Sequence, residues 1–242
     1  MIVGAAVLPT APLLVPGMTT GLPDGFPPLR EAMDRTLLGL PPHELAVVVA
    51  ASRDDAEVGV WDDAVASLGG IGRPDLRIEF PATGGAALAG ELGLPVRAGN
   101  LPLDLSVLTH LVGRQRRLLP ICVSAGASAA DLAKLGAGIA AGIQELAVVV
   151  CAGDLSAGLN ARAPLSLVSE ARAWDDQVVD AVASGRLDGL ARLGPDESLR
   201  VGARGWAALA VLHGICRTAK LGTMVRRYAA PRGVGYLVAS GG

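Results

Sequence analysis

The chain has 242 residues, a formal net charge of −2 and 51% hydrophobic residues, which suits one large α/β domain and excludes a disordered chain. Aromatic residues make up only 3%, and acidic and basic residues are mixed along the chain, so the sequence lacks the basic surface and the stacking platform of a nucleic-acid-binding protein. No apolar run reaches the roughly 18 residues of a membrane-spanning helix, and the apolar start has no basic leader. We therefore expect a cytoplasmic protein that binds neither nucleic acid nor a membrane.

Short apolar runs that are rich in Ala and β-branched residues predict central strands covered by helices. They occupy residues 2–8, 45–51, 118–125 and 145–152. Helical candidates lie between them at 27–40 and 128–144, the second with Ser128 as its N-cap. Alternation of strand and helix predicts parallel crossovers.

After residue 160 the pattern becomes helical. Apolar residues recur at helical spacing over 166–185, and the segment 195–219 repeats this design. Residues 222–240 are typical of two antiparallel strands at a sheet edge, joined through 230–233. With no repeat, linker or charged tail, the prediction is one α/β domain over 1–242: a central, mostly parallel sheet with helices on both faces and a C-terminal antiparallel strand pair.

Three of the predicted strands run into polar or turn-forming loops, which should converge at the carboxyl edge of the sheet. The candidate cleft residues in these loops are Thr10, Pro12, Ser52, Arg53, Asp54, Asp55, Asp154 and Ser156. Their carboxylates are suited to a hard cation such as Mg²⁺ or to an acid and base pair. The alternative is structural, with the same side chains capping helices and bonding to loop amides.

Other motifs have simpler interpretations. The segment 136–141, GAGIAA, matches a dinucleotide-binding fingerprint but follows a helical pattern instead of a strand, so we interpret it as close helix-to-sheet packing. His213 and Cys216 lie one helical turn apart, which permits a metal site but is also typical of a packed helix face. Cys122, Cys151 and Cys216 are expected to be buried thiols.

Several segments together resemble a known family. They are 153–164 with its Gly-Asp-Leu-Ser loop, the pair Trp174 and Asp175, the turn 202–205 before a long helix, the closing 233–239, and the N-terminal 5–18. In this order they resemble the class III extradiol ring-cleaving dioxygenases, of the protocatechuate 4,5-dioxygenase catalytic-subunit type, and the related Memo-like proteins. The resemblance spans nearly the whole chain and implies the α/β fold of that family.

The resemblance also implies a non-haem Fe(II) held by two His and one Glu, with a further His as acid and base. The corresponding positions here are Thr10, the segment 53–55, Ala207 and, for the acid/base residue, Ala157. None of these positions supplies an imidazole, and only the aspartates of 53–55 supply a carboxylate. The hypothesis is a protein without ring-cleavage activity and without a metal or other cofactor.

On this hypothesis the family cleft is retained as a binding surface for a small molecule or a protein. Two alternatives stay open. One is an enzyme of altered chemistry that uses Asp54, Asp55, Asp154 or Ser156 with a divalent cation, Fe or Mg; the other is the family reaction with displaced ligands. The apolar composition and the oligomerisation of the family also predict a homo-oligomer.

Overall fold

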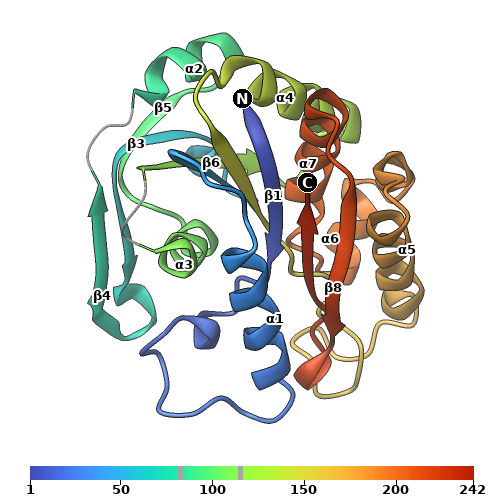
Figure 1. Ribbon diagram of the computed structural model, residues 1–242. Helices are drawn as coiled ribbons and strands as arrows, with labels where there is room; N and C mark the ends of the chain where they lie inside the picture. The colour runs from blue at the N-terminus through green and yellow to red at the C-terminus, as the bar shows by residue number, and fades with distance from the viewer. Residues whose placement is uncertain (81–83, 114–116) are drawn as a thin grey trace.

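The computed structural model describes residues 1–80, 84–113 and 117–242. In these residues the strands form one nine-stranded sheet of order β4-β3-β6-β2-β7-β1-β9-β8, with β5 paired to β3 (Figure 1). The strands are β1 (Ile2–Leu8), β2 (Leu45–Ser52), β3 (Gly59–Leu68), β4 (Arg73–Phe80), β5 (Val96–Asn100), β6 (Arg117–Ser124), β7 (Ala147–Ala152), β8 (Thr223–Ala229) and β9 (Tyr236–Gly241). The helices are α1 (Pro27–Leu38), α2 (Gly85–Leu92), α3 (Leu103–Val112), α4 (Ala129–Gly142), α5 (Ala171–Ala183), α6 (Pro195–Val201) and α7 (Trp206–Ala219).

The centre of the sheet is parallel, and its flanks are antiparallel except for the parallel pair of β3 with β5. Strands β6, β2, β7 and β1 pair in parallel, and β2 is buried over six consecutive residues, Leu45–Ala50. Because successive side chains of a strand point to opposite faces, both faces of this central strand are shielded from solvent. The four predicted strands are therefore confirmed, with β1 matching its expected range.

The expectation of a mostly parallel sheet holds for this centre and, outside it, for the pair of β3 with β5. Strand β3 pairs antiparallel with both β4 and β6, and β9 pairs antiparallel with β1 and β8. The sheet is therefore mixed. Strands β3, β4 and β5 were not predicted, because they are partly exposed and carry polar residues such as Asp62 and Asp63, which weaken the apolar signal.

The C-terminal strands extend the sheet beyond β1. Strand β9 lies between β1 and β8, so the last segment of the chain lies beside the first (Figure 1). This pairing brings the start of β9 to the same end of the sheet as the loop after β7, where Asp154 forms a bridge with Tyr236. The C-terminal strand pair thereby helps to position the loop after β7.

The predicted helix over 195–219 is two helices. Gly202 ends α6 with φ 74°, a left-handed conformation that favours glycine, and α7 begins only at Trp206. The predicted helix over 166–185 similarly begins later, at Ala171. The break between α6 and α7 directs the segment 203–205 toward the carboxyl edge of the sheet.

The glycines of 136–141 serve a helix-to-helix contact, not the expected contact with the sheet. Helix α4 packs closely on α7. A Cβ atom on Gly136 would lie 2.0 Å from the carbonyl oxygen of Val211, and one on Gly214 would lie 1.9 Å from that of Ala133. Close backbone approach therefore requires glycine on both helices, and the dinucleotide fingerprint has no strand before it.

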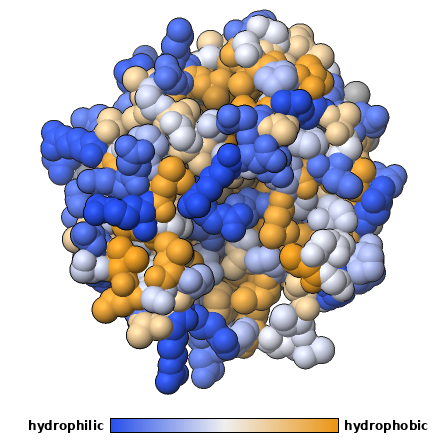
Figure 2. Space-filling view, turned by 180° about the vertical axis from the view of Figure 1, so that it is seen from behind, coloured by the Kyte–Doolittle hydropathy of each residue, from blue (hydrophilic) through white to orange (hydrophobic). Residues whose placement is uncertain are grey.

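Hydrophilic and hydrophobic side chains are mixed on the face seen in Figure 2, which shows no single continuous apolar surface. In the part of the chain that the structure describes, no helix has the length and apolar character needed to cross a membrane. The three cysteines are buried and free.

Candidate functional site

A cavity of about 750 Å³ opens at the carboxyl ends of β1, β2 and β7. Its walls come from the loop after β1, the end of β2, the first turn of α3, the loop after β7, the α6–α7 segment and the start of β9. Parallel strands of one sheet place their carboxyl ends at the same edge, so segments far apart in the sequence meet here.

Most of the predicted cleft residues line this cavity. They are Thr10, Pro12, Ser52, Arg53, Asp154, Ala157 and Ala207. Three others do not line it: Asp54, Asp55 and Ser156. The cleft interpretation is therefore corrected for these three residues.

Each of these three residues instead lies in a turn or in the protein interior. Asp54 accepts a hydrogen bond of 2.9 Å from the backbone amide of Ala56 and caps a short 3-10 helix, Asp55–Glu57. Asp55 is exposed on that turn. Ser156 is fully buried, and its backbone amide donates a 2.9 Å hydrogen bond to Asp175. Short side chains directly after a strand cap turns as readily as they line a cleft, and the sequence pattern does not distinguish the two.

Thr10 and Asp154 form the centre of the polar wall. The backbone amide of Thr10 donates a 2.8 Å hydrogen bond to Oδ2 of Asp154, and the Thr10 hydroxyl donates to the same oxygen. Burial raises the pKa of Asp154 to about 7, and the charge of Asp104 adds to this rise, whereas the Thr10 hydrogen bonds and the charge of Arg204 lower it. This carboxyl group is therefore partly protonated and partly ionised near neutral pH.

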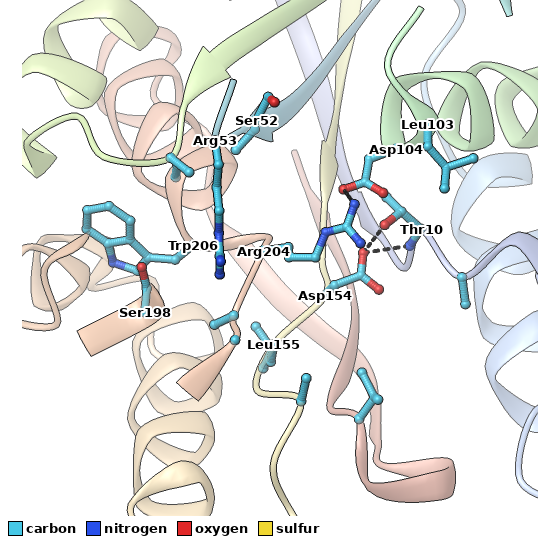
Figure 3. A pocket seen from close by; sticks show the side chains of 18 of the residues that line it. Thr10, Ser52, Arg53, Leu103, Asp104, Asp154, Leu155, Ser198, Arg204 and Trp206 are labelled. Carbon is cyan, nitrogen blue, oxygen red and sulfur yellow. Dashed lines mark hydrogen bonds and ion pairs between the residues drawn. The ribbon is translucent and has the colours of Figure 1, made fainter. Parts of the chain in front are cut away.

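Asp104 and Arg204 form the second polar pair. Nη2 of Arg204 lies 2.6 Å from Oδ2 of Asp104, and the side chains are 57% and 7% exposed, respectively. Burial raises the pKa of Asp104, while the charge and hydrogen bond of Arg204 oppose the rise. In Figure 3 the guanidinium of Arg204 lies beside both Asp104 and Asp154. The ion pair holds this cation in a fixed position at the cavity wall.

Arg53 extends into the cavity from the end of β2 (Figure 3). Among the described residues its guanidinium has neither an ion-pair partner nor a hydrogen-bond acceptor. The nearby carboxylate of Glu57 accepts a hydrogen bond from the hydroxyl of Ser52. Arg53 is thus a cation whose donors are all available to a ligand.

Sequence reasoning missed Asp104, Arg204, Trp206 and Tyr236 as cavity residues. A signal was present for Asp104, because Pro102 followed by an acidic residue is typical of the first turn of a helix. No comparable signal marked Arg204, which reaches the cavity only because the chain turns between α6 and α7.

The residues at the cavity do not fit the iron centre that the family resemblance implies. Thr10 uses its hydroxyl to bind Asp154, and Ala157 and Ala207 have no side-chain donor. Within residues 1–80, 84–113 and 117–242, no group of three or more His, Cys, Asp or Glu side chains is placed to hold a metal ion. A facial triad of two imidazoles and a carboxylate therefore has no ligands here.

No family model matches the chain, and no curated protein matches it either. The crystal structure of an uncharacterized protein from Escherichia coli K12, JW3007, is similar over 98% of both chains, with a TM-score of 0.61 and 15% sequence identity. The likeness shows the fold alone. It supports a single α/β architecture over the length of the chain.

Proposed function

We propose that the protein binds a small organic molecule in the cavity at the carboxyl edge of the sheet. The observation that carries this proposal is the cavity itself, whose volume of about 750 Å³ lies in the range of ligand pockets, roughly 300–1,000 Å³. Its wall is largely apolar, with Trp206 and several leucines, and a few polar groups converge at Thr10, Asp104, Asp154 and Arg204. Apolar walls with a few fixed polar groups are typical of small-molecule sites.

On this proposal the chain is a divergent extradiol-dioxygenase-like protein that keeps the family cleft but not the ring-cleavage reaction. Support comes from the chemistry of three of the four positions that the resemblance implies for the iron ligands and the acid/base residue. Threonine at position 10 and alanine at positions 157 and 207 leave no imidazole or carboxylate there. We also propose that the protein is cytoplasmic and self-associates.

A second candidate function is proton transfer to or from the bound molecule. It is favoured by the position of Asp154 in the cavity wall and by its pKa of about 7, since a general acid or base works best with a pKa near the working pH. Asp154 is then the reacting group, and Arg204 stabilises negative charge that develops on the molecule. Asp54, Asp55 and Ser156 have no part in this function because they lie outside the cavity.

A fragment screen tests the main proposal. Small organic fragments are screened by ligand-observed NMR against the full chain and against Ala125→Trp, which places a large ring at a half-buried position of the cavity wall. The matched control is Ala130→Trp, at an exposed position of α4 outside the cavity. We expect fragments that bind the native chain and the control but not Ala125→Trp. A screen without any such fragment would contradict the proposal.

A further inference from the structure

The polar groups of the cavity differ in whether they have hydrogen-bond partners within the protein. Oδ2 of Asp154 accepts two hydrogen bonds from Thr10. Oδ2 of Asp104 accepts from Arg204, and Oε2 of Glu57 accepts from Ser52. Each carboxylate is thus engaged by a protein donor, whereas Arg53 donates no hydrogen bond to any described residue. Arg53 is solvent-exposed at the cavity, so its donors are open to a ligand that supplies an acceptor.

The charges lead to the same conclusion. Arg204 is paired with Asp104, and Asp154 carries only part of a charge at neutral pH because burial raises its pKa to about 7. Arg53 forms no ion pair with any acidic side chain of the described residues. The guanidinium of Arg53 offers a positive charge with up to five donors.

The rest of the cavity wall is suited to the apolar part of a ligand. Leu103 and Leu165 are 36% and 46% exposed although they border the cavity, and Trp206 lies deeper. A Cβ atom on Gly202 would lie 2.5 Å from Cδ1 of Leu165, so the glycine lets Leu165 pack against the backbone at this wall. A molecule that covers these side chains would remove apolar surface from water, which favours binding by about 25 cal/mol per Å².

From these observations we infer that the ligand is a small organic acid, whose carboxylate pairs with Arg53 and whose apolar body covers the leucines at the cavity wall. A monoanion fits better than a phosphate dianion, because Arg53 offers a single positive charge to balance it and the carboxylate of Glu57 also lines the cavity. This inference rests on the proposed function, since it names the class of molecule that the cavity takes.

The test is isothermal titration calorimetry of the full chain with three probes that share one apolar body: 3-phenylpropanoate, 3-phenylpropanamide and 3-phenylpropylamine. The anion should bind most tightly. Arg53→Gln should weaken the anion about tenfold, because a hydrogen bond between charged groups is lost, and should leave the amide unchanged. Arg53→Lys should restore part of the affinity, since it keeps the charge but not the planar fork of donors. The control is Arg192→Gln, an exposed arginine outside the cavity.

The outcomes separate the two proposals. If the amide or the amine binds as tightly as the anion, or if Arg53→Gln weakens the anion no more than Arg192→Gln does, the acid inference is overturned and the small-molecule site stands. The same holds if all three probes fail while uncharged fragments bind in the cavity. If the probes and all fragments fail to bind there, the proposed function is overturned as well.

Discussion

The backbone amide and the hydroxyl of Thr10 both donate hydrogen bonds to the same carboxylate oxygen of Asp154. The two residues are 144 positions apart in the chain, and the contact joins the loop after β1 to the loop after β7. It satisfies the buried carboxyl group of Asp154 through Thr10, the position where the family resemblance implies a metal ligand.

Replacing Thr10 tests the contact directly. Thr10→Val keeps the shape but removes the hydroxyl donor, so we expect the free energy of unfolding to fall by about 1–2 kcal/mol. The loss should be larger at pH 8 than at pH 5, because a hydrogen bond to an ionised carboxylate is stronger. Urea denaturation at both pH values measures it. Thr10→Ser is the control, and an equal loss in both variants would show that packing, not the hydroxyl, is responsible.

The pH dependence of stability should reflect Asp154. Its pKa is raised to about 7 in the folded chain from an ordinary value of about 4, so the folded state binds more protons between these two values. The contribution of Asp154 to stability should therefore be fully present below about pH 4, fall by up to about 1.4 kcal/mol per pH unit as the pH rises, and be lost above about pH 7.

The variant Asp154→Asn should remove this part of the pH dependence while keeping an acceptor for Thr10. Urea denaturation from pH 4 to pH 8 measures the change. Asp180→Asn, at an exposed position of α5, is the control and should keep the native slope. An unchanged slope in Asp154→Asn would mean that Asp154 does not titrate in this range.

The ion pair of Arg204 with Asp104 is partly shielded from water. Arg204→Gln leaves the buried Asp104 without its cation, and we expect the free energy of unfolding to fall by about 1–3 kcal/mol at pH 8. This is less than for a fully buried pair because Arg204 is 57% exposed. Arg200→Gln breaks an exposed pair with Glu170 and should cost less than about 1 kcal/mol. Equal effects in the two variants would argue against a special role for the cavity pair.

Metal titration tests whether the side chains at the cavity can bind a metal ion. Anaerobic calorimetry with Fe(II), and separately with Mg²⁺, should show no stoichiometric binding, because Thr10, Ala157 and Ala207 supply no imidazole or carboxylate at the positions implied by the family. Protein purified without chelators should likewise lack stoichiometric iron by elemental analysis. Stoichiometric Fe(II) binding with turnover of catechol would overturn the proposal that ring cleavage is lost.

The contact between α4 and α7 should be sensitive to single methyl groups. Gly136→Ala places a Cβ atom 2.0 Å from a backbone oxygen of Val211, which neither helix can relieve without moving. We expect a loss of at least about 2 kcal/mol in the free energy of unfolding. Gly90→Ala, on the exposed side of α2 with no atom within 4 Å, should instead raise stability by up to about 1 kcal/mol. Thermal denaturation of both variants compares them.

The sequence alone was sufficient for the central strands and for the class of fold. Residues 45–51 and 145–152 are apolar on both faces, a pattern that only a buried strand or a buried helix satisfies, and their length and β-branched content favour the strand. The flanking strands could not be read in this way. Strands such as β3 and β5 are partly exposed, and their pairing depends on contacts with neighbours that lie far away in the chain.

For the site, the sequence determined which loops would follow the central strands, and so it placed Thr10, Arg53 and Asp154 at one edge of the sheet. Only the tertiary structure decided which side chains face the cavity. Asp54 and Asp154 follow neighbouring strands in similar loops, yet one caps a turn and the other is buried against Thr10. The direction of a side chain after a strand depends on a few backbone dihedrals and on long-range partners such as Asp104 and Arg204, and local sequence does not encode those partners.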